Sequence, residues 1–319
     1  ARELPPLVEA ILARQAGATP PLKPRGPFPP ERQKTLGKAL MTRLGFDFEA
    51  GRLDESTHPF CGGTPSDIRI TTRYREDEIA SALMGVLHET GHALYEAGLP
   101  KRWTGQPVGE ARGIAVHESQ SLLVEMQACR SPAFIRFLAG ELEAAFGPDP
   151  AFAADNLVRL YAEVERSLIR VDADEATYPL HVVLRHRLER RLIAGELAVA
   201  DLPEAWNGAM RELLGIVPPD DRLGCLQDIH WPVGAFGYFP CYTLGAMLAA
   251  QLFRAAQAQV PGLMDAIGRG DFGPLLGWLR EHVHGQGAKP GFAELVKTAT
   301  GGPLAVEPFL DHLRERYLG

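Results

Sequence analysis

The chain has 319 residues, enough for one large domain or two of ordinary size, and 45% of them are hydrophobic, which allows a sizeable core. Its 33 basic and 40 acidic residues give a net charge of −7, which argues against general binding to nucleic acids or anionic membranes. No apolar run reaches the ~18 residues that span a membrane, and the first residues lack a signal-peptide pattern. Four scattered cysteines without a Cys-x-x-Cys pair favour reduced thiols in a cytoplasmic protein.

The first 75 residues predict two helices and one strand. Helices are expected over residues 3–15 and 31–44, and the stretch 19–30 between them is an extended connector, because its six prolines exclude a helix. Residues 67–74 alternate in polarity and are rich in β-branched side chains, which predicts a strand. Few other segments have a β pattern.

A helix is predicted from Ile79 to Gly98, because apolar residues recur at helical spacing and Gly98 with Pro100 ends the pattern. It contains His88-Glu89-Thr90-Gly91-His92. Histidines four apart share one face of a helix, with Cβ atoms roughly 5–6 Å apart. Two such imidazoles can hold a tetrahedral zinc ion, while Glu89 beside them is free to act on a metal-bound water. The alternative is a surface helix that happens to carry two histidines.

A zinc site with two histidines needs a third protein ligand and an open position for water. Glu118 lies 26 positions after His92 on a second predicted helix, over residues 109–128. Its apolar flanks indicate a half-buried face, where a carboxylate is costly unless it is paired or coordinated. Three other roles remain open: a capping acid for Glu110, an outer partner of the metal site for Glu125, and a structural or catalytic histidine for His117.

The remaining sequence predicts further helices over residues 131–146, 151–167, 174–195 and 201–214, another after Pro240, and three or four between 261 and 319, with a loop at 285–291. Arg187, Arg190 and Arg191 with Glu189 form a solvated face to which we assign no function.

Residues 224–245 are dense in glycine, aromatic and polar residues and have little helical pattern before Pro240. A loop of this kind between helices is a candidate active-site wall. A hydroxyl or imidazole there could donate to the oxyanion that forms when a peptide carbonyl is attacked. Aromatic packing is the alternative for each of these residues.

Six motifs in this order resemble the thermostable (Taq-type) metallocarboxypeptidases, peptidase family M32, over about residues 55–250. The motifs are His58-Pro59-Phe60, Asp67-x-Arg69-x-Thr71, His88-Glu89-x-x-His92, His117-Glu118-Ser119-Gln120, Ile169-Arg170-x-x-Ala173-Asp174 and Gly224-x-x-Gln227-Asp228-x-His230-Trp231. The resemblance implies a mainly α, multi-helix peptidase fold like that of neurolysin and angiotensin-converting enzyme. The predicted strand adds a small β-sheet near the metal site.

The resemblance also implies removal of single amino acids from peptide C-termini, with zinc or cobalt as the metal and a homodimer as the assembly. His88, His92 and Glu118 would be the ligands and Glu89 the general base. The groups implied to face the tetrahedral intermediate are His230 with Tyr238 or Tyr242. Arg170 is the first choice to bind the substrate's terminal carboxylate, because a guanidinium fork suits a carboxylate. Arg69, which follows Asp67 in its motif, is the second.

Members of that family have a large N-terminal helical portion ahead of the first motif, whereas only 57 residues precede His58 here. We therefore expect one catalytic domain over residues 1–319 that lacks most of that portion and has a more open groove. Two other functions remain open: an oligopeptidase or dipeptidyl carboxypeptidase of the same clan, and a non-catalytic peptide-binding relic.

Overall fold

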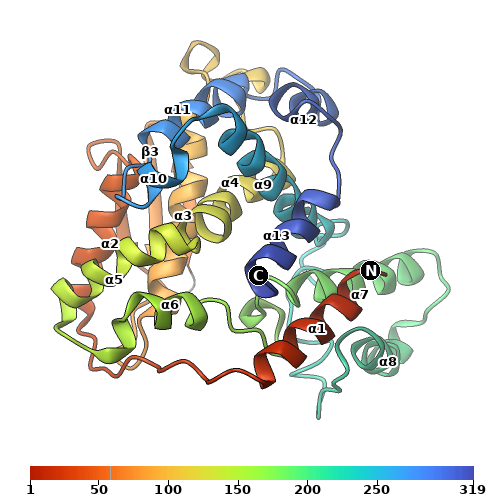
Figure 1. Cartoon of the computed structure of the whole chain (residues 1–319). Helices are drawn as coiled ribbons and strands as arrows, with labels where there is room; N and C mark the ends of the chain where they lie inside the picture. Colours follow the sequence, from red (N-terminus) through yellow and green to blue (C-terminus); the bar gives the residue numbers. More distant parts are fainter. Residues whose placement is uncertain (58) are drawn as a thin grey trace. The chain divides into compact units, whose positions relative to one another are not determined.

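The computed structural model describes residues 1–57 and 59–319 (Figure 1). Its described residues form thirteen α-helices and one three-stranded sheet, which confirms the mainly α prediction. The first helices and the strands are α1 (Leu4–Ala16), α2 (Pro30–Leu44), β1 (Gly51–Glu55), β2 (Phe60–Thr64), β3 (Asp67–Thr72), α3 (Ala80–Gly98) and α4 (Ile114–Leu122). The remaining helices are α5 (Pro132–Phe146), α6 (Ala154–Leu160), α7 (Tyr178–Ile193), α8 (Leu202–Leu214), α9 (Pro240–Gln259), α10 (Leu263–Ile267), α11 (Gly273–His282), α12 (Phe292–Thr300) and α13 (Glu307–Tyr317).

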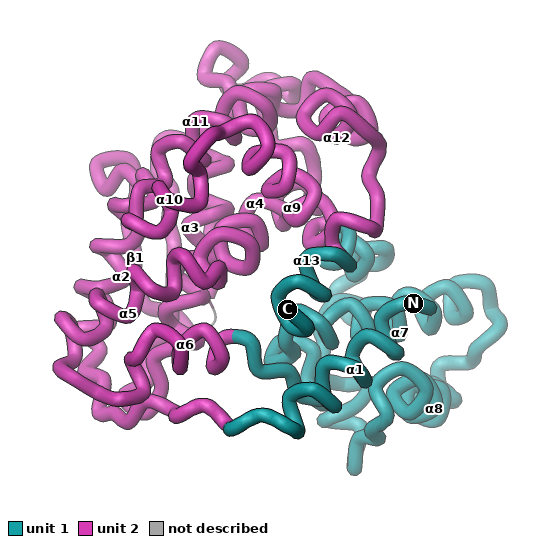
Figure 2. Tube along the Cα trace, in the orientation of Figure 1, with its two compact units in different colours: residues 1–19, 162–244, 310–319 teal, residues 20–161, 245–309 magenta. Residues whose placement is uncertain are grey.

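The chain divides into two compact units, each assembled from segments that are distant in the sequence (Figure 2). Unit 1 comprises Ala1–Thr19, Ala162–Leu244 and Leu310–Gly319, and unit 2 comprises Pro20–Tyr161 and Gly245–Phe309. The single catalytic domain expected from the sequence stays a prediction. None of the described helices combines the length and apolar character needed to cross a bilayer.

Helix α3 is the central element of unit 2 and lies beside α2 and α4 (Figure 1). Its apolar positions, among them Leu83, Leu87 and Leu94, are buried in the main core of this unit. The Glu78 carboxylate accepts a hydrogen bond of 2.9 Å from the Ser81 amide, which satisfies one of the free N–H groups at the helix start. The structure thus confirms the predicted helix to within one residue at its start.

The three strands form a sheet in the order β1-β3-β2, with β1 parallel and β2 antiparallel to β3. Ile68 and Ile70 point to the face that packs on Val86 and Ala93 of α3. The sheet therefore lies against the helix that carries the histidine motif. β1 and β2 were not predicted, because they contain few of the β-branched residues that indicate a strand. Pairing with β3 makes them strands.

Three predicted helices are shorter in the structure, and one of them, expected over 174–195, spans Tyr178–Ile193. The helix expected over 109–128 begins only at Ile114, since Gly113 has a φ of +84°, which a right-handed helix excludes, and it continues as a π-helical segment, Leu123–Cys129. The helix expected over 151–167 ends at Leu160. Beyond it, the backbone N–H of Val164 donates to the Gln15 side chain at 3.0 Å, and its C=O accepts from the same side chain at 2.9 Å. A residue distant in the sequence thus supplies the hydrogen bonds that neighbouring helical turns would otherwise make.

Candidate metal centre

A glycine allows the two helices of the histidine motif and of Glu118 to approach closely. A Cβ atom on Gly91 of α3 would lie 2.6 Å from the carbonyl oxygen of Gln120 and from the Cα of Ser121, both on α4. Real Cβ atoms essentially never come that near to backbone. Position 91 must therefore be glycine for α4 to cross α3 at this distance and bring Glu118 to the histidines.

The structure brings His88, His92 and Glu118 together in unit 2. One ligand atom from each lies within 4.8 Å of the other two. The His88 and His92 Nε2 atoms are 4.0 and 3.6 Å from the two Glu118 carboxylate oxygens. In a tetrahedral zinc site, bonds of 2.0–2.2 Å place ligand atoms about 3.4 Å apart. The observed separations are close to this, so the three groups suit a divalent metal.

An acidic residue holds the first of these histidines. The His88 Nδ1 atom donates to Glu125 at 3.0 Å, and the other Glu125 oxygen accepts from the Arg130 guanidinium at 2.6 Å. Burial raises the pKa of Glu125, but the charges of Arg130 and His88 outweigh it and hold this pKa at about 2. Glu125 is therefore an ionised partner that engages Nδ1 of His88, and Nε2 of the same ring faces Glu118.

A second histidine holds His92. The Nδ1 atoms of His92 and His117 are 2.6 Å apart, and His117 Nε2 donates to the Glu96 carboxylate at 2.8 Å. Both predicted ligand histidines thus engage Nδ1 in protein hydrogen bonds, which leaves both Nε2 atoms available for a cation. The sequence left the role of His117 open and gave no signal for Glu96, because this contact joins two different helices.

Glu89 lies between the two histidines in sequence, and only 9% of it is exposed. Burial raises its pKa, His88 offsets part of that rise, and Glu118 and Glu125 add to it. Cys61 of β2 is near: burial together with the charges of Glu89 and Glu96 raises the pKa of its thiol to about 12. Among the described residues, the group that could hold a metal ion consists of His88, His92 and Glu118 and does not include Cys61.

A different set of predicted residues comes together in unit 1. Only 5% of Arg170 is exposed, and its guanidinium donates to the Tyr178 hydroxyl at 2.5 Å and to Asp228 at 2.7 Å. The other Asp228 oxygen accepts from fully buried Arg185 at 2.7 Å. One carboxylate is thus shared by two guanidinium groups, which leaves an excess of positive charge. Arg185 escaped prediction because it lies in a run of basic residues that looks solvated.

His230 of unit 1 lies within hydrogen-bonding reach of Tyr242, with 3.3 Å between Nε2 and the hydroxyl, and its ring is 5.4 Å from that of Tyr238. Glu189 holds the intervening loop, since its oxygens accept from Trp231 Nε1 and from the Gly237 amide, each at 2.6 Å. The prediction of a solvated Glu189 was therefore wrong: the residue is 6% exposed, because the loop covers it.

The remaining predicted positions give no assembled site. Arg69 and Asp67 pair with each other at 2.7 Å, and about half of each side chain is exposed. They alternate along β3 with the buried Ile68 and Ile70, so they lie on the sheet face turned away from α3. Their roles in substrate binding stay predictions. His58 lies outside the described residues.

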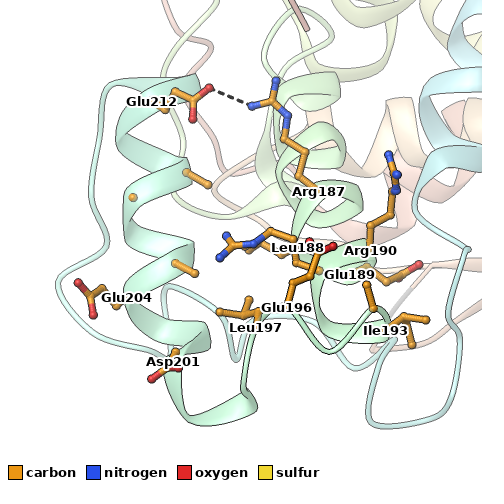
Figure 3. Close-up of a pocket in the computed structure, with 15 residues that line it drawn as sticks. Arg187, Leu188, Glu189, Arg190, Ile193, Glu196, Leu197, Asp201, Glu204 and Glu212 are labelled. Carbon is orange, nitrogen blue, oxygen red and sulfur yellow. Dashed lines mark hydrogen bonds and ion pairs between the residues drawn. The ribbon is translucent and has the colours of Figure 1, made fainter.

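A cavity of about 1260 Å³ lies in unit 1 between the end of α7 and helix α8 (Figure 3). Its rim carries opposite charges, such as Arg187 and Glu212, which pair at 2.9 Å. Among the described residues that line it, none belongs to the predicted site.

Comparisons with known proteins agree with this geometry. Residues 1–317 match the family described as Carboxypeptidase Taq (M32) metallopeptidase. The chain is 44% identical to thermostable carboxypeptidase 1 of Thermus thermophilus, over 91% of this chain and 57% of the relative. Among solved structures, it matches Trypanosoma cruzi metallocarboxypeptidase 1 with a TM-score of 0.97 and 45% identity, over 100% of this chain and 67% of that one. The M32 carboxypeptidase of Deinococcus radiodurans matches with a TM-score of 0.93 and 42% identity, over 98% of this chain and 63% of that one. The chain spans about 57% of the length of the curated Thermus relative.

Proposed function

Because this chain belongs to the carboxypeptidase Taq (M32) family of metallopeptidases, we propose that it is a metal-dependent carboxypeptidase that removes single amino acids from peptide C-termini. One observation carries the proposal. His88, His92 and Glu118 converge on one point, and Glu89 lies on the same helix as both histidines. A cluster that only bound metal would have no need of this acid.

The donor set of two imidazole nitrogens and one carboxylate oxygen favours zinc, and cobalt suits the same ligands. The bound ion would lower the pKa of a water molecule and polarise the scissile carbonyl. Glu89 accepts the proton of the attacking water and passes it to the leaving amine. Its buried position keeps this carboxylate away from bulk solvent, which suits a group that must exchange protons only with the substrate and the attacking water.

Residues of unit 1, together with Arg69 of unit 2, supply the rest of the proposal. The surplus positive charge at Arg170 and Arg185 supports recognition of the terminal carboxylate, with Arg69 as the second candidate beside Asp67. His230, with Tyr238 or Tyr242, would donate to the oxyanion. That His230 and Tyr242 lie 3.3 Å apart supports a shared role for these two groups.

We also propose peptides as substrates, a second copy of the chain as partner, and a cytoplasmic location. The four cysteines are scattered and form no Cys-x-x-Cys pair, which supports a reducing compartment.

The test is the release of amino acids from an N-blocked peptide, followed by mass spectrometry. The whole chain would be measured as purified, after chelation, and after addition of zinc or cobalt. We expect stepwise loss of single C-terminal residues that stops with the chelator and returns with either metal.

Dipeptide or internal products would instead assign an oligopeptidase or a dipeptidyl carboxypeptidase. A folded chain that binds metal and cleaves no peptide would assign a binding protein. Comparing a short peptide with a folded protein as substrate tests the open groove, and hydrolysis of only short peptides would contradict it.

A further inference from the structure

The two ligand histidines are held in different ways. His88 donates directly to a carboxylate, that of Glu125, whereas a second imidazole, His117, lies between His92 and the carboxylate of Glu96. Glu96 is on α3, four residues after His92, and His117 is on α4 next to Glu118. The contact therefore ties the two helices that carry the ligands.

The hydrogen bonds fix where the protons are. For Nε2 of His92 to offer a lone pair to a metal, its Nδ1 must carry the proton. That proton is donated to His117 Nδ1, so His117 carries its own proton on Nε2. The latter atom is the one that lies 2.8 Å from Glu96. In the series His92–His117–Glu96, each N–H donor thus meets one acceptor, and the Glu96 carboxylate is the last acceptor.

Packing keeps His117 in this place. The Tyr95 ring, fully buried, lies edge-on to the His117 ring at 5.2 Å, and the Tyr95 hydroxyl accepts from the Arg112 amide at 2.9 Å. About a quarter of the His117 side chain and of the Glu96 side chain is exposed. Both side chains thus lie at the edge of the core, where their hydrogen bond links α4 to α3 beside His92.

We propose that His117 and Glu96 are positioning residues that orient His92 toward the metal, and that Glu96 acts only through His117. The inference rests on metal binding by His88, His92 and Glu118, which is part of the proposed function, but not on peptide cleavage. Outer partners of metal-bound histidines fix the tautomer and ring orientation, and their loss typically weakens metal binding about 10–100-fold.

The test compares three variants of the whole chain: Glu96→Ala, His117→Leu and the double variant. Zinc affinity is measured by competition with a chromophoric chelator, and the ligand geometry by the visible absorption of the cobalt form. We expect His117→Leu to weaken zinc binding about 10–100-fold and to change the cobalt spectrum. Glu96→Ala should weaken binding less, and the double variant should bind zinc as His117→Leu does.

Matched controls remove exposed residues of the same types: Glu143→Ala on α5 and His186→Leu on α7 should leave both readouts unchanged. His117→Asn, whose amide oxygen takes the place of Nδ1 as an acceptor, should recover part of the affinity. This variant keeps the test decisive if His117→Leu does not fold.

Additive losses in the double variant, or normal zinc affinity and cobalt spectrum in Glu96→Ala, would overturn the proposal. A folded wild-type chain that binds no divalent metal would overturn both this inference and the proposed function. Coupled losses of affinity in a chain that cleaves no peptide would support the positioning role and contradict the carboxypeptidase.

Discussion

Gly91 and Gln120 are in such close contact that a Cβ atom at position 91 would lie 2.6 Å from the Gln120 carbonyl oxygen. Replacement by alanine must therefore push α3 and α4 apart. We expect Gly91→Ala to lower the free energy of unfolding by about 1–3 kcal/mol, as overpacking does, and to weaken zinc binding.

Gly85 of the same helix provides the matched control, because a Cβ there meets nothing within 4 Å. Gly85→Ala should raise the free energy of unfolding by about 0.5–1 kcal/mol, since glycine is unfavourable inside a helix. Denaturant titration measures the free energy of unfolding of both variants, and chelator competition measures their zinc affinity. Equal behaviour of the two variants would show that the close crossing of α3 and α4 does not determine the site.

Glu89→Gln keeps the shape of the side chain and removes the base. Because Glu89 is not one of the three converging donors, zinc affinity should remain near that of the wild type. Peptide hydrolysis should fall by about 10²–10⁴-fold, the contribution of a positioned general base. Metal content by mass spectrometry and initial rates with an N-blocked peptide are the two measurements. Full activity of this variant would end the proposed mechanism.

Glu189→Ala removes both acceptors that hold the loop of His230. Without it, the Trp231 Nε1 and Gly237 N–H donors lose their acceptors at 2.6 Å, and each lost hydrogen bond to a charged group costs about 1.5–3 kcal/mol. Amide hydrogen exchange across residues 231–238 should become faster. Glu196→Ala, at an exposed position in the turn after α7, is the control that should leave exchange unchanged. Protection equal to that of the wild type would contradict the anchoring role.

Asp228→Ala would leave Arg170 and Arg185 buried without their shared carboxylate. Removing one partner of a buried ion pair costs about 3–5 kcal/mol, so a large loss of stability is expected at neutral pH. The exposed residue Asp221 offers a control, since Asp221→Ala should cost little.

The pH dependence of that loss follows from the pKa of Asp228. Burial raises this pKa, but Arg185 and Arg170 outweigh burial and hold it below its usual value of 3.8. A carboxylate with a depressed folded-state pKa stabilises the fold fully above the unfolded-state value and loses this effect as the pH falls through the folded-state value. The difference between wild type and Asp228→Ala should thus be constant above about pH 5 and shrink below pH 4. Denaturant titrations at several pH values measure it, and a difference that grows on acidification would contradict the assignment.

Patterns within one segment of the sequence were sufficient to predict those elements whose structure does not depend on contacts with distant residues. Helix α3 follows from apolar spacing, and β3 from its alternation, because both signals lie within one short stretch of sequence. Glu118 could be selected as the candidate third ligand because a carboxylate on a buried helical face requires a partner. These predictions did not require knowledge of which helices and strands contact one another in the fold.

The features that escaped prediction depend on contacts between distant residues. β1 and β2 become strands by pairing with β3, and α6 ends early because Gln15 binds the backbone of Val164. Burial of Glu189 depends on a loop more than 40 residues away. No periodicity within a single helix carries such information.

The candidate metal cluster and its hydrogen-bond partners lie within one continuous stretch, from His88 to Arg130. The loop that must close to bring α3 and α4 together is therefore short, and closing it costs little chain entropy. Contacts that are local in sequence form faster than distant ones. By contrast, the arginine-containing and aromatic cluster around Asp228 requires residues 170, 185 and 242 to meet. The part of the proposed site that would bind the cation thus belongs to the kinetically simpler part of the fold.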